Sequence, residues 1–226
     1  MSEKSTVTAD FVRAAIDNYA PWKLGNDVLY ELCATHPYHT EDAVIIGKFW
    51  LIGRSYAAAI ERRRVSGDRE VSEDYRGDDI YTKQLAPTIR RNMIDRWFDA
   101  LKVVEPVPAT ALQIHKTLTD LLHRITGMDN RSLVSKYLHF HFPAVYFIYD
   151  SRALTSVGEL YRQFGGKPLR SAGCDVADLK YAPFWTHCEF VSSKIAVLME
   201  RKITPRELDC VLVEWWASNK RKKHRG

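Results

Sequence analysis

The stretch SLVSKYLHFHFPAVYFIYDSRA, residues 132–153, decides the fold and the chemistry that we expect of this chain. Its first half places apolar and aromatic residues at helical spacing and ends at Pro143, because proline cannot continue a helix. A short apolar run then leads to the acid Asp150. Lys136 lies within the apolar first half. Burying an ionisable group is costly unless the group is paired or functional, so the stretch predicts an amine and a carboxylate with defined partners.

Lys136 and Asp150 each allow a structural and a functional interpretation. Lys136 is either a helix lysine whose stem packs while its amine reaches water, or a nucleophile whose pKa is lowered by apolar neighbours. Asp150 is expected to cap the helix that begins at Ser151, and a carboxylate at that position can also stabilise a sugar cation. The sequence leaves the role of Lys136 open and favours a functional role for Asp150.

The remaining chain also reads mostly as helix. Helical spacing covers residues 8–19, 27–35, 40–64, 81–101 with a kink near Pro87, 109–124, 151–164, 184–201 and the segment after Thr204. Thr204, Pro205 and Glu207 predict a capping box with a preset first turn. Tyr146–Tyr149 is the best candidate for a short extended piece. The fold class is therefore predicted to be all-α, a compact multi-helix domain with little or no β-sheet.

The expected organisation is a single helical unit over residues 1–226, or two subdomains near 1–105 and 106–219 with the cleft between them, followed by a basic tail at 220–226. The 226 residues are 46% hydrophobic, which is enough to form a core. No apolar run approaches the roughly 20 residues that a membrane helix needs, and the N-terminus has no apolar signal core. Four scattered cysteines form no Cys-x-x-Cys pair. These features predict a cytoplasmic protein that makes no membrane contact.

The net charge suggests a class of partner, and the absence of several motifs excludes classes of enzyme. The net charge of +5 suits an anionic partner such as nucleic acid. The sequence contains neither a phosphate-cradling Gly-x-x-x-x-Gly-Lys loop nor Gly-x-Gly-x-x-Gly nor Gly-x-Ser-x-Gly. Nucleotide hydrolysis, dinucleotide chemistry and ordinary serine hydrolysis therefore have no support.

A helix with a lysine, a turn and an aspartate at the start of the next element resembles the catalytic core of the helix-hairpin-helix DNA glycosylases. The resemblance covers residues 112–155, where Lys136 and Asp150 match the two catalytic positions. In that family the lysine attacks the anomeric carbon of a modified nucleotide, and the aspartate stabilises the sugar cation or activates water. The candidate hairpin, residues 125–130, lacks the proline and the second glycine of the family pattern.

The resemblance implies a DNA glycosylase that flips a modified base out of the duplex and cuts its N-glycosidic bond, in DNA repair or in antiphage defence. The expected partner is double-stranded DNA with a modified or damaged base, and the protein is expected to be a monomer. Neither a cofactor nor a metal is expected, because a carboxylate can stabilise the departing sugar cation. Whether strand cleavage by a lyase step follows is left open.

Further residues are expected to contact the substrate. The candidates for the flipped nucleotide are Tyr56, Tyr137, His139, Tyr149 and Arg152. The candidates for the DNA backbone are Arg62, Arg90, Arg91, Asn130, Lys220, Arg221 and Lys222. For the alanine and arginine segment around Tyr56 and Arg62, and for the basic tail, ordinary helix packing and a solvated terminus are the competing interpretations.

Two other functions compete with base excision. The first is a non-catalytic helical DNA-binding or regulatory protein in which Lys136 contacts a phosphate. The second is a metal-dependent nuclease that uses His139, His141 and Asp150 as ligands. Residues two apart on a helix point to different faces, which argues against the metal site.

Overall fold

The computed structural model describes residues 6–62, 79–102, 108–168 and 177–223. Within these ranges the secondary structure consists of ten α-helices and three shorter 3₁₀ or π-helical pieces, with no strand. The all-α prediction is confirmed for this part of the chain. Tyr146–Tyr149 is irregular backbone rather than a strand. None of the helices in the same ranges combines the length and apolar character that a membrane-spanning segment requires.

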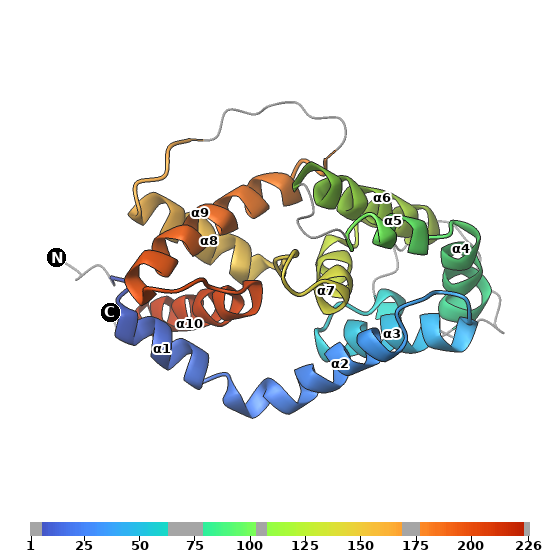
Figure 1. Cartoon of the computed structure of the whole chain (residues 1–226), viewed down its shortest axis with the longest axis horizontal. Coiled ribbons are helices and arrows are strands. Elements are labelled where there is room, and N and C mark those ends of the chain that lie inside the picture. Colours follow the sequence, from blue (N-terminus) through green and yellow to red (C-terminus); the bar gives the residue numbers. More distant parts are fainter. Residues whose placement is uncertain (1–5, 63–78, 103–107, 169–176, 224–226) are drawn as a thin grey trace.

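One group of helices brings the beginning of the chain against its C-terminal part (Figure 1). It contains α1 (Ala9–Asp17), α8 (Ser151–Gln163), α9 (Tyr181–Met199) and α10 (Pro205–Lys223). Helix α1 begins where the Thr8 hydroxyl accepts a hydrogen bond from the backbone N–H of Phe11. The ring of Phe11 then packs edge-on against Trp215 of α10.

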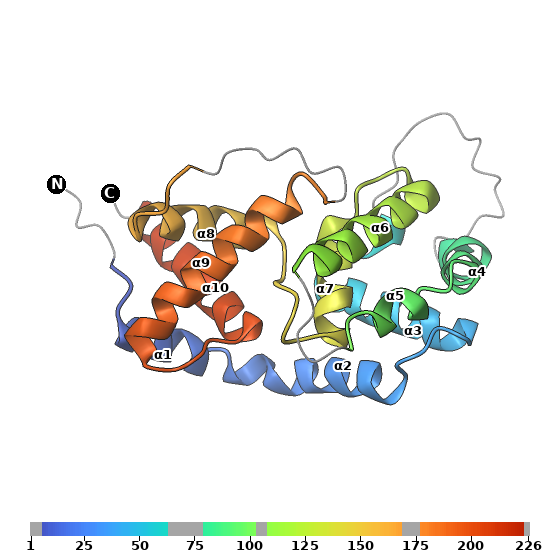
Figure 2. The same cartoon turned by 45° about the horizontal axis from the view of Figure 1, so that its top comes forward.

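The second group surrounds α7 (Arg131–His141), which lies centrally in both views (Figures 1 and 2). Its other members are α2 (Lys23–Thr35), α3 (Asp42–Ser55), α4 (Ala86–Arg91), α5 (Asp95–Asp99) and α6 (Pro108–Thr126), with the short pieces η1 (Ala20–Trp22), η2 (Ile60–Arg62) and η3 (Ile80–Leu85). Residues 133–140 of α7 are all buried. A helix that is buried on every side is a core element, and α7 contacts α2, α3 and α6.

The two groups do not follow the boundary near residue 105 that the sequence suggested. Helix α1 packs on α9 and α10, whereas α6 and α7, which follow residue 105, pack on each other and α7 packs on α2 and α3. Helix α7 is buried over residues 133–140, and the helices α2, α3 and α6 that contact it all come earlier in the chain. The site at α7 is therefore assembled from distant parts of the chain.

Two predicted helices are shorter than expected. The helix predicted to reach residue 64 ends at Ser55, because Ala57 adopts a φ of 51° and turns the chain. Gly53 permits this turn, since a Cβ atom there would lie 3.1 Å from the Cα of Ala59. The helix predicted over 81–101 is divided into the π-helical η3, then α4 and α5. Met93, with a φ of 47°, separates α4 from α5.

Candidate active site

The chain between α6 and α7 forms a tight turn at the position of the candidate hairpin. Gly127 has a φ of 73°, which glycine adopts without strain. The amide of Asn130 donates to the Thr126 hydroxyl over 2.7 Å and to the carbonyl of Met128 over 3.0 Å. Asn130 was expected to contact DNA, but its side chain is buried and stabilises the turn. The amide is thus already used within the hairpin, and the DNA contact expected of Asn130 stays a prediction.

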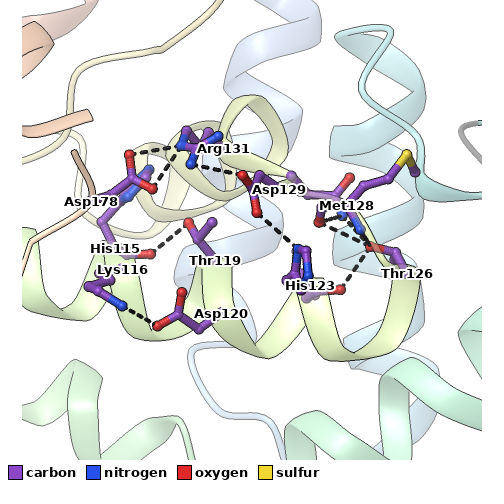
Figure 3. A network of polar contacts seen from close by, with 12 residues as sticks. His115, Lys116, Thr119, Asp120, His123, Thr126, Met128, Asp129, Arg131 and Asp178 are labelled. Carbon is purple, nitrogen blue, oxygen red and sulfur yellow. Dashed lines mark hydrogen bonds and ion pairs between the residues drawn. The ribbon is translucent and has the colours of Figure 1, made fainter. Parts of the chain in front are cut away.

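Arg131 fixes the start of α7 against the start of α9 (Figure 3). Its Nε donates to both carboxylate oxygens of Asp178, over 2.8 and 2.7 Å, and its Nη2 lies 2.9 Å from Asp129. Burial alone would raise the pKa of Asp178, but Arg131 and the backbone N–H groups of Tyr181 and Lys180 more than offset it and lower that pKa. Asp178 is therefore a paired anion that ties the hairpin to α9.

Lys136 is buried, with only 1% of the residue exposed. Its Nζ donates to the Ser132 hydroxyl over 2.8 Å and to the carbonyl of Tyr149 over 3.1 Å. The same Nζ lies 5.7 Å from the centroid of the Tyr56 ring. The interpretation in which this amine reaches water is therefore wrong. The amine instead connects α7 to the segment that precedes α8.

The segment before α8 is attached to α7 through its backbone. The N–H of Tyr149 donates to the Ser135 hydroxyl over 2.9 Å, and the carbonyl of Tyr146 lies 2.7 Å from Nδ1 of His139. At its end, Asp150 accepts hydrogen bonds from the N–H groups of Arg152 and Ala153, both over 2.9 Å. The predicted cap of α8 is confirmed. Asp150 is thus held in a fixed position one residue from the carbonyl that binds Lys136.

A third component comes from α10 and was not predicted. Arg206 donates from Nε to the Tyr30 hydroxyl over 3.0 Å, and from Nη1 to the Tyr19 hydroxyl and to Asp209 over 3.2 and 3.0 Å. The Tyr56 hydroxyl donates to Asn26 over 2.5 Å. We call Arg206, Asp209, Tyr19, Asn26, Tyr30 and Tyr56 the Arg206 cluster. The guanidinium carbon lies between 5.5 and 5.8 Å from the ring centroids of the three tyrosines and Phe140.

His139 extends the Arg206 cluster into α7. Burial, assisted by the charge of Arg206, lowers the pKa of His139 to about 3, so its ring is neutral at pH 7. Because the carbonyl of Tyr146 can only accept, Nδ1 carries the proton, and Nε2 accepts from the Tyr30 hydroxyl over 2.6 Å. The Tyr30 oxygen in turn accepts from Arg206. This chain of hydrogen bonds links α10, α2 and α7.

Four charged groups influence one another at this site. Burial raises the pKa of Asp209; Arg206 and Lys136 oppose this change, and Asp150 adds to it. Burial by itself would lower the pKa of Arg206, but Asp209 and the three tyrosines more than offset it, so the guanidinium pKa is raised. The arrangement therefore combines two cations and two carboxylates in a largely apolar setting, where charge interactions are stronger than in water.

Two of the predicted nucleotide contacts point elsewhere. Tyr137 is fully buried on another face of α7, where its ring stacks on Phe49 at 3.9 Å. Consecutive helix residues point in different directions, so the side chain of Tyr137 lies on a different face of α7 from that of Lys136. The ring of Tyr149 packs edge-on against Phe184, and only its carbonyl reaches the lysine. Tyr56 and His139, in contrast, do lie at the site.

The predicted basic contacts are scattered over the surface. Arg90 is ion-paired with Asp42, and Arg91 donates to the carbonyl of Pro87. Arg152 is exposed and its guanidinium lies 4.9 Å from the centroid of the Trp216 ring.

The amine of Lys220 lies 4.7 Å from the centroid of the Trp216 ring. Residues 220–223 continue α10 and are not a tail. The side chains of Arg62, Arg221 and Lys222 and the whole of residues 224–226 lie outside the described part of the chain.

The alternative metal site is not assembled. Both ring nitrogens of His139 already have partners, Tyr30 and the carbonyl of Tyr146. His141 lies on the other side of α7, with its ring centroid 5.3 Å from that of His39. Across residues 6–62, 79–102, 108–168 and 177–223, no three His, Cys, Asp or Glu side chains are grouped so that they could hold a metal ion.

Searches of known protein-family models, curated proteins and solved structures find no match to this chain.

Proposed function

We propose that this chain is a DNA glycosylase of the helix-hairpin-helix type that removes a modified base from double-stranded DNA. The observation that carries the proposal is the buried amine of Lys136, which binds the carbonyl of Tyr149 immediately before Asp150. The tight turn between α6 and α7 and the cap of α8 supply the expected helix–turn–helix–aspartate order. A buried lysine whose charge, together with that of Asp150, acts on the buried Asp209 is an unusual and costly arrangement unless it serves chemistry.

In the proposed reaction Asp150 faces the sugar of the flipped nucleotide. As the N-glycosidic bond lengthens, positive charge develops on the sugar, and a fixed carboxylate stabilises it or accepts a proton from the attacking water. The hydrogen bonds from Arg152 and Ala153 orient that carboxylate before the substrate arrives. Preorganisation of this kind avoids reorganisation during the reaction. No cofactor is needed for this route.

Lys136 is proposed to position the acid rather than to attack the sugar. Its amine is fully enclosed and hydrogen-bonded to Ser132 and to the backbone of Tyr149, so it holds the segment that ends in Asp150. Borohydride distinguishes the two roles. A Schiff base between Lys136 and the sugar would be trapped as a covalent protein–DNA adduct, whereas the proposed route gives none. Lys136→Gln should still slow base removal, and full activity of that variant would contradict both roles.

The proposed partner is double-stranded DNA bound by a monomer, in repair or in defence against phages with modified bases. The net charge of +5 and the exposed Arg91 and Lys220 suit phosphate contacts. Duplex oligonucleotides that each carry one modified base provide the test, incubated with and without a chelator. Alkali-labile abasic sites formed in chelator support the proposal. Cleavage that is lost in chelator would favour a metal-dependent nuclease instead.

The second candidate function is non-catalytic DNA binding, and the enclosure of Lys136 favours it, because a purely structural lysine would have the same hydrogen bonds. This alternative predicts a salt-dependent gel shift without abasic product. Each lost phosphate contact lowers the slope of log affinity against log salt by about 0.9. Removing residues 220–226 should reduce that slope if the basic segment contacts DNA, and should leave it unchanged if the segment is only solvated.

A further inference from the structure

Arg206 has hydrogen-bond donors that the described part of the chain does not satisfy. A guanidinium carries five N–H groups. One on Nε is used by Tyr30, and two on Nη1 are used by Tyr19 and Asp209. Nη2 is buried and has no hydrogen-bond partner among the described residues. Unpaired donors on a buried charged group are unfavourable, and in native structures they often mark a place where something else binds.

The acceptors around Nη2 are already occupied. Asn26 uses its carbonyl oxygen for the Tyr56 hydroxyl, and Asp209 is paired with Nη1. The Tyr30 hydroxyl accepts from Nε and donates to His139. The Arg206 cluster therefore retains an unused donor, Nη2 of Arg206. Its three tyrosines are only partly buried, so the cluster reaches the surface, and the Tyr56 ring also lies beside Lys136.

We propose that Arg206 determines substrate specificity by donating from Nη2 to a carbonyl oxygen of the flipped base. This inference rests on the proposed function. A base with a carbonyl at the recognised edge accepts from Nη2, whereas a base with an amino group there places one donor against another and leaves the guanidinium unpaired. The site should therefore select carbonyl-bearing bases over their amino counterparts.

A phosphate oxygen offers the same acceptor chemistry, but the surroundings favour a base. Four aromatic rings flank the guanidinium, and planar rings stack well on bases. Only 16% of the Arg206 side chain is exposed, and it is joined to Asp209 of the same helix. The substrate base is expected to enter where the partly exposed tyrosine rings line the cluster.

The first experiment varies the substrate and leaves the protein intact. Duplexes carry hypoxanthine or adenine, uracil or cytosine, and 5-hydroxymethyluracil or 5-hydroxymethylcytosine, so that each pair differs by a carbonyl and an amino group. We expect kcat/KM to favour the carbonyl member of an excised pair by roughly 100-fold or more. A methylphosphonate next to the target nucleotide tests the phosphate source. If the methylphosphonate abolishes the rate advantage that Arg206 provides, and exchanging the carbonyl for an amino group on the base does not, the assignment of Nη2 to the base is overturned.

The second experiment varies Arg206. Arg206→Lys keeps the charge beside Asp209 but removes Nη2, so selectivity within a pair should fall to a few-fold while the slower member is cleaved as before. Arg201→Lys is the matched control, because Arg201 is exposed and paired with Glu207 near the start of the same helix. Circular dichroism melts establish that each variant is folded. If Arg206→Lys is unfolded, the substrate pairs with the intact protein decide the question.

The two proposals fail in different ways. If the intact protein removes no base from any duplex, the glycosylase proposal is wrong and the inference about Arg206 falls with it. If it removes both members of a pair at equal rates, or prefers the amino member, the glycosylase proposal stands and the role of Arg206 is wrong. Unchanged selectivity in a folded Arg206→Lys variant would likewise show that Arg206 does not determine specificity.

Discussion

Two buried lysines, Lys48 in α3 and Lys136 in α7, have nearly the same immediate partners and very different surroundings. Lys48 is completely buried, and its Nζ donates to the carbonyls of His36 and Tyr38 over 2.9 and 3.3 Å. Lys136 likewise binds a carbonyl and one further oxygen. The burial of a lysine amine is therefore not sufficient to identify a reactive lysine.

The carboxylates distinguish the two sites. The Lys48 amine lies 3.1 Å from Nε2 of His39, whose other nitrogen is paired with Asp95 over 2.5 Å. His39 and Asp95 border a cavity of about 310 Å³, but Asp95 has a partner there, and Arg90 on the cavity wall is paired with Asp42. Lys48 thus holds the segment between α2 and α3 against α3 through hydrogen bonds to its backbone carbonyls. The charge of Lys136, in contrast, acts with that of Asp150 on Asp209, and both acids belong to the other group of helices, at the cap of α8 and in α10.

The largest expected effect is unfolding in acid, because both lysine sites contain buried histidines. Burial lowers the pKa of His39 to about 4 and that of His139 to about 3, from 6.5. As the pH falls below 6.5 the unfolded chain binds protons that the folded protein resists, so stability present above pH 6.5 is lost between pH 6.5 and 4. Each histidine contributes about 3 kcal/mol. The urea midpoint measured by circular dichroism should therefore be much lower at pH 4.5 than at pH 7.5.

His141→Phe should reduce the slope of that acid transition. Its pKa is lowered well below 6.5 by burial and by the neighbouring Lys48 and His39. An aromatic ring without a titrating group fits the same ring-lined position. An unchanged slope in the folded variant would show that His141 is protonated as easily as in the unfolded chain.

Asp150→Asn and Asp95→Asn form the next comparison. Asparagine can still cap α8, so the first variant should keep its fold and its DNA binding while base removal slows by about 3 kcal/mol in transition-state stabilisation, roughly 100-fold. Asp95→Asn should do the reverse, with a loss of about 1–3 kcal/mol in stability and little change in rate. Single-turnover excision and urea titration measure the two effects. Equal excision rates in the two variants would show that Asp150 takes no part in the reaction.

Lys48→Met tests the structural lysine through its pH dependence. Burial lowers the pKa of Lys48 from 10.5 to about 8. Between these values the unfolded chain holds a proton that the folded protein has released, so the stability of the wild-type protein relative to the variant should rise with pH. The full rise is about 3 kcal/mol between pH 8 and 10.5. The measurement is the difference between the two urea midpoints at each pH, which cancels the titration of tyrosines common to both proteins.

The smallest expected effect compares two helix caps. Thr204→Ala and Thr8→Ala each remove one capping hydroxyl and should lower stability by about 1 kcal/mol. Thr204 and Glu207 form a reciprocal box at the start of α10, two residues before Arg206. Only Thr204→Ala should therefore also reduce excision measurably. Equal excision rates in the two variants would show that the cap does not position Arg206.

The predictions that succeeded depend on local signals. Pro143, the capping pattern at Thr204 and the acid before Ser151 indicate helix ends through interactions within a few residues, and the structure has helix ends or caps at these places. These features need no knowledge of the tertiary arrangement. The apolar neighbours of Lys136 left open whether its amine reaches water, and the structure shows that the residue is buried.

The features that the sequence did not indicate depend on where distant segments meet. Tyr137 was expected to contact the substrate, and in the structure its ring stacks on Phe49 of α3. Arg206 and Asp209 could not be found, since their tyrosine partners lie far away in the sequence. The sequence signal is an arginine and an aspartate three apart in the charged first turn of α10, which resembles an ordinary surface ion pair.

The distance between Arg206 and Tyr30 along the sequence also determines how late during synthesis their hydrogen bond can form. The two residues are 176 positions apart. At roughly 5–20 residues per second, a ribosome adds Arg206 about 9–35 s after Tyr30. Tyr30 is present without the Arg206 cation throughout that interval, and His139 and Asp150 are without it from the time they are made. A nascent chain that already contains Lys136 and Asp150 therefore still lacks Arg206, whose hydrogen bonds to Tyr19 and Tyr30 form only after α10 has been made and has packed.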